Sequence, residues 1–322
     1  FWNGEKNGRG KFKYPNGNIY NGEWKDDNRH GQGTFKYVNG SSYTGEWSNG
    51  LIHGYGIYKY VNGDIYEGDF KEGKMHGWGY YKFKNGNEYH GQWEDDKMEG
   101  EGIYTSAAGN SYEGYFSDGR LDGPGSFRSY LGETYVGNWL GGRMHGQGLY
   151  VFANGSKYEG EWVHDKRTGY GIYSYANGSV YEGTFENGKR NGKGIYKNVN
   201  GDIYEGDWIE NKMDGKGNYF YKNGDTYIGE WLKDMRHGEG ILSFSEGKKY
   251  KGSFFQNSIN GNGTMSFSDG KIFIGNWVDG SMEGKGSYQD LNGNSYEGQW
   301  KNNNYHGIGV FEYSNGNVYD GE

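Results

Sequence analysis

The sequence predicts an all-β fold, an elongated, single-layer, twisted antiparallel sheet built from tandem 23-residue β-hairpins. Three observations predict it. Large aromatic residues recur at a constant spacing along the whole chain, and glycines recur at fixed offsets from them. Aliphatic residues are too scarce to fill a thick two-layer core, whereas aromatic residues, at 19%, are too frequent for a disordered chain.

The repeat begins with one aromatic residue in each of fourteen copies, 23 residues apart and without an insertion. Glycine follows two residues later, and Trp or Phe follows four residues later. A Gly-x-Gly pair and a turn glycine complete the unit, a further turn site holds glycine in seven copies, and only Gly141 lies off this lattice. The glycines are therefore structural positions. The fourteen aromatic residues are Tyr20, Tyr43, Tyr66, Tyr89, Tyr112, Tyr135, Tyr158, Tyr181, Tyr204, Tyr227, Tyr250, Phe273, Tyr296 and Tyr319.

Strand alternation places the rings and the glycines of each repeat on one face of the sheet. We expect each ring to lie opposite a glycine, so that it can cover neighbouring backbone. The simplest antiparallel register then predicts the pairs Phe70–Gly79, Gly68–Tyr81, Tyr66–Phe83, Gly79–Trp93, Tyr81–Gly91 and Phe83–Tyr89.

Two kinds of link connect the strands. This register leaves a five-residue link at 84–88, in which Asn-Gly supplies a positive φ at Gly86. The other link carries Gly73, at a site filled only by Gly, Asp or Asn, and this restriction predicts a left-handed backbone. On the polar face, Glu67 is expected between Lys59 and Lys82 as a cross-strand ion pair.

The sequence resembles the MORN-repeat family, whose unit is similar to Y-x-G-x-W-x-x-G-x-x-H-G-x-G. The chain carries it as YTGEWSNGLIHGYG (43–56), YVGNWLGGRMHGQG (135–148) and YIGEWLKDMRHGEG (227–240). The resemblance covers residues 1–322 as one continuous array that begins and ends in mid-repeat, as a segment of a longer protein would. It implies a β-hairpin array of the kind found in cytoskeletal and ciliary scaffolds, in junctophilins, and beside catalytic domains such as phosphatidylinositol-phosphate kinases.

The residues favour no catalytic, cofactor-binding or metal site. No cysteine is present, and the Gly-x-Gly pairs lack the third glycine of a dinucleotide fingerprint. Histidines such as His30, His53 and His76 recur one repeat apart, about 10 Å given two strand spacings, which is too far for one zinc ion. The net charge of −8 argues against nucleic acid as a partner. We therefore expect a non-enzymatic chain, with catalysis elsewhere in a longer polypeptide left open.

Two surfaces are candidates for binding. The first is a groove of aromatic residues for a helical or extended segment of another protein, or for a second copy in a homodimer. It consists of Tyr43, Trp47, Tyr66, Phe70, Tyr81, Phe83, Tyr89 and Trp93. The second is a stripe for acidic ligands, including membrane lipids, formed by Lys13, Lys36, Lys59 and Lys82.

The favoured interpretation is a cytoplasmic scaffold or adaptor in a cytoskeletal or axonemal assembly. The alternatives are a membrane-associated module that binds acidic phospholipids or phosphoinositides, and the regulatory repeat region of a larger kinase-like enzyme.

Overall fold

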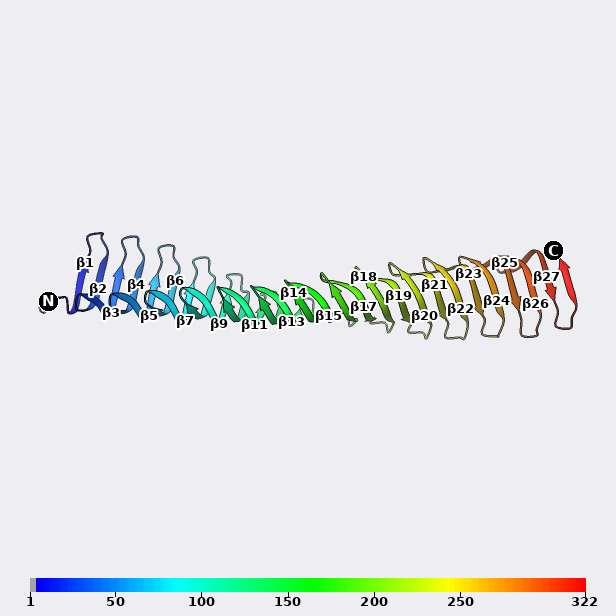
Figure 1. Cartoon of the computed structure of the whole chain (residues 1–322), viewed down its shortest axis with the longest axis horizontal. Helices are drawn as coiled ribbons and strands as arrows, with labels where there is room; N and C mark the ends of the chain where they lie inside the picture. The colour runs from blue at the N-terminus through cyan, green and yellow to red at the C-terminus, as the bar shows by residue number, and fades with distance from the viewer. Residues whose placement is uncertain (1–3) are drawn as a thin grey trace. The chain divides into compact units, whose positions relative to one another are not determined.

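The computed structural model describes residues 4–322, and over this range it contains 28 strands of one antiparallel sheet and no helix (Figure 1). The predicted all-β architecture of tandem hairpins is confirmed. The strands are β1 (Gly8–Lys13), β2 (Ile19–Lys25), β3 (Asn28–Lys36), β4 (Ser42–Ser48), β5 (Leu51–Lys59), β6 (Ile65–Lys71), β7 (Lys74–Lys82), β8 (Glu88–Glu94), β9 (Lys97–Thr105), β10 (Ser111–Ser117), β11 (Arg120–Arg128), β12 (Thr134–Leu140), β13 (Arg143–Val151), β14 (Lys157–Val163), β15 (Lys166–Ser174), β16 (Val180–Glu186), β17 (Lys189–Lys197), β18 (Ile203–Ile209), β19 (Lys212–Phe220), β20 (Thr226–Leu232), β21 (Met235–Ser243), β22 (Lys249–Phe255), β23 (Ser258–Ser266), β24 (Ile272–Val278), β25 (Ser281–Gln289), β26 (Ser295–Lys301), β27 (Asn304–Glu312) and β28 (Val318–Gly321).

The strands belong to two compact units, each of which is described here by itself. Unit 1 comprises Phe1–Gly155 and Glu161–Lys166, and unit 2 comprises Ser156–Gly160 and Arg167–Glu322. Within each unit, successive strands pair in antiparallel fashion, two strands to a repeat, as β6 with β7 and β7 with β8. We number each repeat from its first aromatic residue, so that Tyr66 occupies position 1 and Gly79 position 14.

The register differs from the predicted one by two residues, and the predicted pairs are wrong. In β6–β7, Tyr66 lies opposite Tyr81 and Gly68 opposite Gly79, so rings face rings and glycines face glycines. In β7–β8, Gly79 lies opposite Gly91 and Tyr81 opposite Tyr89. The cause is the link between β6 and β7. It is only two residues long, and a bulge opposite Gly68–Phe70 takes up two extra residues of the second strand, around Gly77, which has a φ of 66°.

The two links are different hairpin turns. In the short one, Glu72 and Gly73 have φ angles of 53° and 88°, which is a type I′ turn and confirms the left-handed backbone expected at Gly73. Gly141, the one glycine off the lattice, has the same role as Glu72, with a φ of 57°.

The other link is a three-residue loop closed by Phe83, whose carbonyl accepts a hydrogen bond of 2.9 Å from the Gly86 amide. Gly86 has the predicted positive φ, 90°. The link spans 83–87 rather than 84–88, because Lys82 pairs with Glu88.

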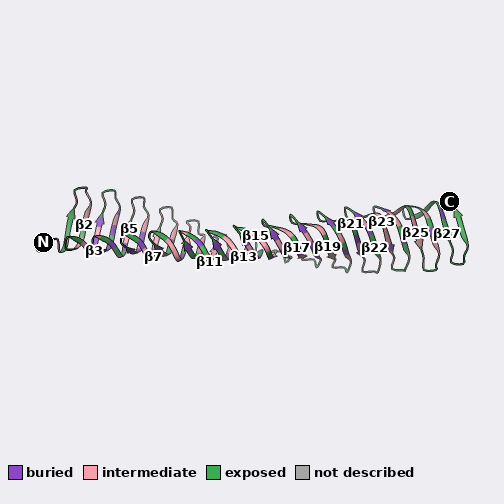
Figure 2. Ribbon diagram, in the orientation of Figure 1, coloured by how far each residue is buried: buried purple, intermediate pink, exposed green. Residues whose placement is uncertain are grey.

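The glycine pairs form the floor on which the core tyrosines lie. A Cβ on Gly79 would stand 2.5 Å from Cε2 of Tyr66, and one on Gly68 would stand 2.5 Å from Cα of Gly79. The Tyr66 ring therefore covers this pair, and its hydroxyl donates to the carbonyl of Asp69 at 2.9 Å. Trp93 meets the Tyr66 ring edge-on at 5.4 Å. Glycine costs strand propensity, which this ring packing offsets. Figure 2 shows buried residues on strands throughout the described chain.

Side-chain caps join each repeat to the next at both kinds of turn. At the type I′ turn, position 8 accepts from the amide of position 10 in the preceding repeat, as Asp96 does from Met75 at 2.8 Å. At the three-residue loop, position 22 accepts from the amide of position 19 in the following repeat, as Asp64 does from Lys84 at 2.8 Å. These contacts provide hydrogen-bond acceptors for loop amides that have no partner in the hydrogen bonding between strands.

Candidate functional site

Most of the predicted aromatic groove is core. Six of its eight residues are at most 6% exposed, so the expectation that they form an accessible groove is wrong. The physical reason is the glycine floor. It lets the rings lie directly on the backbone of the single sheet, so that little of each ring stays exposed. Only Tyr81 and Phe83 remain half-buried. The six buried residues are Tyr43, Trp47, Tyr66, Phe70, Tyr89 and Trp93.

Position 10 supplies a lid over the core rings that the sequence reasoning missed. The Arg190 guanidinium lies 4.2 Å from the Trp208 ring centroid, and its Nη2 donates to the Asn211 carbonyl at 2.7 Å. In other repeats the lid is apolar, as with Met75, which is 7% exposed. The available signal was a long side chain at one phase of every repeat. These lid residues are Lys6, Arg29, Ile52, Met75, Met98, Leu121, Met144, Arg167, Arg190, Met213, Arg236, Ile259, Met282 and Tyr305.

A continuous ladder of partly exposed rings runs across the strands of unit 1, beside the three-residue loops. Its members occupy positions 16 and 18, and neighbouring ring centroids lie between 4.4 and 6.3 Å apart. It passes through the two accessible residues of the predicted groove and ends where Ser106 replaces a ring. The ring ladder consists of Phe12, Tyr14, Phe35, Tyr37, Tyr58, Tyr60, Tyr81, Phe83 and Tyr104.

The ring ladder is uncharged at neutral pH. Burial is the main cause that raises the pKa of Tyr37 and of Tyr60 to about 12. Except for Phe35, which is 5% exposed, its members are half-buried or exposed. The ring ladder can therefore present an aromatic surface, with hydroxyl groups at its edge, to a partner protein.

The predicted lysine stripe is present and exposed, but the predicted cross-strand ion pair with Glu67 does not form. Lys13, Lys36, Lys59 and Lys82 are all exposed, and Lys82 lies 3.4 Å from Glu88. Over residues 4–322, the other three have no carboxylate within ion-pair distance. The prediction for Glu67 is wrong because the register places it between Ile57 and Tyr80.

The histidine position lies in the second strand of each hairpin, beside the bulge. His76 and His145 are half-buried, and the Nδ1 atom of each is buried without a hydrogen-bond partner. Acidic residues at the same position cap the next type I′ turn, as Glu99 does by accepting from the Asp118 amide at 3.0 Å. In the described part of the chain, no group of three or more His, Cys, Asp or Glu residues could hold a metal ion.

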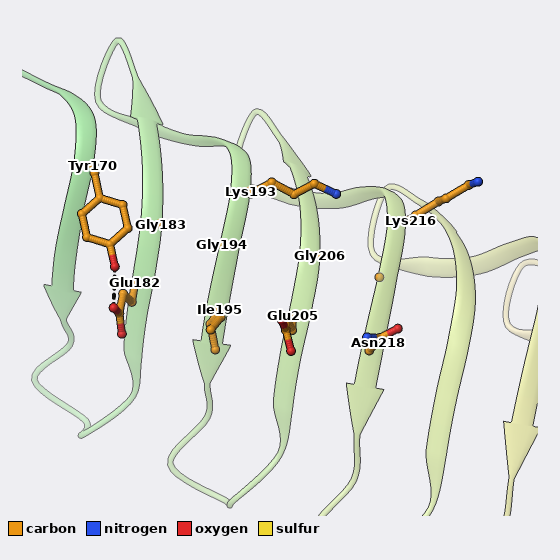
Figure 3. A pocket seen from close by; sticks show the side chains of 11 residues that line it. Tyr170, Glu182, Gly183, Lys193, Gly194, Ile195, Glu205, Gly206, Lys216 and Asn218 are labelled. Atoms are coloured by element: carbon orange, nitrogen blue, oxygen red, sulfur yellow. Dashed lines mark hydrogen bonds between the residues drawn. The ribbon is translucent and has the colours of Figure 1, made fainter.

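The face of the sheet opposite the core rings is hollowed above the strands. In unit 2, one hollow is lined by Tyr170, Glu182, Lys193, Glu205 and Lys216, with the Tyr170 hydroxyl donating to Glu182 (Figure 3). Lys193 forms an ion pair of 2.6 Å with Asp207. Charges of both signs therefore meet in this hollow.

A second hollow on this face lies in unit 1. It is lined by Trp78, His90, Glu101, Ile103 and Tyr115, and also by Glu113 and Pro124. Trp78 is 50% exposed, although most large rings of the chain lie against the glycine floor. No lysine or arginine lines this hollow. The signal in the sequence was the presence of Trp at a position that is polar in most copies.

The family model described as MORN repeat matches fourteen times in succession, from residues 1–19 through 20–42 and onward to 296–318. The chain belongs to the MORN-repeat family. No curated protein matches it. Within residues 4–322 the MORN array has no helix long and apolar enough to cross a membrane.

Solved structures show weak likenesses. The SAS-4 TCP domain of Drosophila melanogaster, in complex with a proline-rich motif of Ana2, is 16% identical, with a TM-score of 0.32 over 55% of this chain and 90% of that chain. The wild-type TCP10 domain of Danio rerio CPAP is 13% identical, with a TM-score of 0.25 over 68% and 93%. A virginiamycin B lyase from Staphylococcus aureus is 10% identical, with a TM-score of 0.14 over 99% and 95%. Likenesses this weak do not bear on function.

The MORN signature is explained by folding alone in this chain. The Tyr, both kinds of glycine and the Trp or Phe of the unit build the floor, the core and the turns, as Tyr66, Gly79 and Phe70 show. Residues that distinguish one MORN array from another must therefore lie outside the signature. In this chain, accessible residues outside the signature include the ring ladder and the side chains of the opposite face.

Proposed function

We propose that this MORN array is a non-enzymatic scaffold that binds segments of partner proteins along the ring ladder of unit 1. The single observation that carries the proposal is the ring ladder itself, nine contiguous rings of which only Phe35 is fully covered. Aromatic surface that a chain leaves accessible in a continuous strip is typical of protein interfaces. A cytoskeletal or axonemal setting in the cytoplasm is part of the proposal and is supported by the resemblance to scaffold members of the family.

The dimensions of the ring ladder suit an elongated partner segment. It crosses the sheet from β1 to β9, eight strand spacings, or about 38 Å. A helix of roughly 25 residues has this length. Its apolar side chains, repeating every seventh residue at about 10.5 Å, would follow ring pairs that recur every two strands, at about 9.6 Å. An extended segment, or a second copy of the chain, would meet the same rings.

Removal of one ring pair from the ring ladder tests the proposal. Tyr58→Ala with Tyr60→Ala interrupts the ring ladder in its middle, whereas Tyr219→Ala with Tyr221→Ala removes an equivalent pair from unit 2. After circular dichroism has shown both variants to be folded, crosslinking and mass spectrometry on native material should map partner crosslinks beside β5–β7 in the wild type and in the unit 2 variant. We expect the ladder variant to lose them. Unchanged crosslinks in a folded ladder variant would refute the proposal.

Binding of acidic lipids is the second candidate function, because Lys13, Lys36 and Lys59 have no carboxylate partner in the described chain. Flotation with anionic vesicles at low and high salt tests it, with Lys36→Gln and Lys59→Gln as the variant. Absence of binding at low salt would eliminate this candidate and leave the ring ladder as the binding surface.

A further inference from the structure

The face of unit 1 opposite the core rings carries negative charge and no positive charge near its centre. On β5–β10, two residue rows in the middle of this face contain the carboxylates Glu67, Asp69, Glu101 and Glu113 and no lysine or arginine. In the neighbouring row, the ammonium group of Lys82 is engaged by Glu88 at 3.4 Å, whereas that of Lys59, on β5, has no carboxylate partner among the described residues. The equivalent rows of unit 2 contain Lys193 and Lys216.

Aromatic rings stand among these carboxylates. Trp78 and Tyr115 line the unit 1 hollow and are 50% and 47% exposed. The His90 ring lies nearly perpendicular to Trp78 with centroids 6.2 Å apart, and Trp78 remains 50% exposed beside the hollow. An exposed indole face attracts a cation through its negative ring potential, and Trp does so more strongly than Tyr or Phe.

Hydrogen bonding fixes one carboxylate and leaves the other free. The Tyr115 hydroxyl donates to Oε1 of Glu101 at 2.9 Å, which orients that side chain and leaves its second oxygen unused. Among the described residues, the Glu113 carboxylate has no hydrogen-bond or ion-pair partner. The hollow therefore combines an accessible indole with two carboxylates that have unused acceptor capacity, while no cation of the described chain neutralises them.

We propose that this hollow binds an arginine or lysine side chain of a basic segment in a partner protein. Trp78 would stack on the cationic group, and Glu101 and Glu113 would accept its hydrogen bonds. The inference goes beyond the proposed function, because the ring ladder lies on the other face and recognises apolar surface. The two surfaces can therefore fail independently.

A peptide titration tests the inference with the whole chain. The probe is a short fluorescent peptide in which arginine alternates with glycine and serine, and its partner probe has glutamine in place of arginine. We expect anisotropy to show binding of the arginine peptide alone, and weaker binding at about 0.5 M salt, where the Debye length is roughly 4 Å. Equal binding of the glutamine peptide would overturn the proposal.

Matched variants separate this site from the general negative charge of the protein. Glu101→Gln with Glu113→Gln should weaken binding about fivefold, and Trp78→Ala about threefold. The controls Glu182→Gln with Glu205→Gln, and Tyr170→Ala, make the same kinds of change in unit 2 and should alter binding by less than about twofold. An equal loss in the control variants would refute a specific site.

Photo-crosslinking on the wild-type chain makes the result independent of how the variants fold. An arginine peptide that carries a benzophenone group should form adducts on β7–β10. Adducts spread evenly over units 1 and 2 would refute the inference even if every variant lost binding.

Discussion

The amide nitrogen of Met75 donates a hydrogen bond of 2.8 Å to Oδ1 of Asp96, although 21 residues separate the two in sequence. In return, the Asp96 amide donates to the carbonyl of Met75 at 3.1 Å. This reciprocal pair gives Asp or Asn at position 8 its role, because the contact is made to the backbone of position 10 in the preceding repeat and needs no particular side chain there. The same cap joins Lys6 to Asp27, Met144 to Asp165, Arg190 to Asn211, Met213 to Asp234, Arg236 to Asn257 and Met282 to Asn303.

Replacement of Asp96 tests this cap. Asp96 has a φ of 70°, so Asp96→Ala would lose the acceptor and put alanine in left-handed backbone, which Asp and Asn tolerate better, at a cost of about 1–2 kcal/mol. Asp96→Asn keeps the acceptor, as Asn211 does naturally, and should change stability by less than about 0.5 kcal/mol. Hydrogen exchange at the Met75 amide is the measurement. Exchange as slow in the Ala variant as in the Asn variant would contradict the role of the cap.

The glycine floor makes a second prediction. Gly79→Ala would place a Cβ 2.5 Å from the Tyr66 ring and should destabilise the protein by about 1–3 kcal/mol. Gly10 occupies the same position in the first repeat, where the nearest atom to a Cβ is 3.7 Å away. Gly10→Ala should therefore change stability by less than about 0.5 kcal/mol, and urea unfolding compares the two. Equal effects would show that strand propensity, rather than the floor, determines the cost.

The sequence was sufficient to predict the hairpins, both kinds of turn glycine and the common face of the rings, because period and backbone preference are local properties. It was not sufficient for the register. Pairing a ring such as Tyr66 with a glycine or with another ring keeps the same face inward, so alternation does not distinguish registers that differ by two residues. The bulge opposite Asp69 decides between them. Its positive-φ residue, Gly77, is the first glycine of a Gly-x-Gly pair, and strand alternation alone does not identify that glycine as a bulge residue.

The candidate site was harder to predict than the fold. Rings such as Trp47 and Trp93 were expected to need a partner to cover them, because a single sheet ordinarily exposes one face. The depth to which rings sink onto paired glycines depends on three-dimensional contact, as do the lid contacts of Arg190. Of the residues that line the hollow of unit 1, only Trp78 was conspicuous in the sequence.

The lid makes a third prediction. Arg190→Ala removes the guanidinium that covers Trp208 and its hydrogen bond to Asn211, and should lower stability by about 1–2 kcal/mol. Arg190→Met restores apolar cover, as Met213 provides in the next repeat, and should recover about half of this loss. Thermal unfolding is the measurement, with Arg9→Ala as the control because the Arg9 side chain is 83% exposed. No recovery with Met would assign the whole effect to the hydrogen bond.

The last prediction concerns the core tyrosines at alkaline pH. Burial raises the pKa of Tyr20, Tyr135 and Tyr250 from the ordinary value of 10.0 to about 12, and all three side chains are fully buried in the sheet. Above pH 10 the unfolded chain loses these protons while the folded chain keeps them. The contribution of these tyrosines to the free energy of unfolding is therefore fully present below pH 10 and is lost as the pH rises toward 12.

Tyrosinate absorbance and circular dichroism, followed together against pH, check this order of events. Exposed tyrosines should ionise reversibly near pH 10, and the core tyrosines only as the strand signal disappears. Tyr250→Phe copies the natural Phe273 of the next repeat. At neutral pH this variant should be less stable by about 1 kcal/mol, because it lacks the hydrogen bond to the Ser253 carbonyl. Above pH 10 its stability should decline less steeply than that of the wild type. An unchanged alkaline slope in this variant would mean that Tyr250 ionises equally well in the folded sheet.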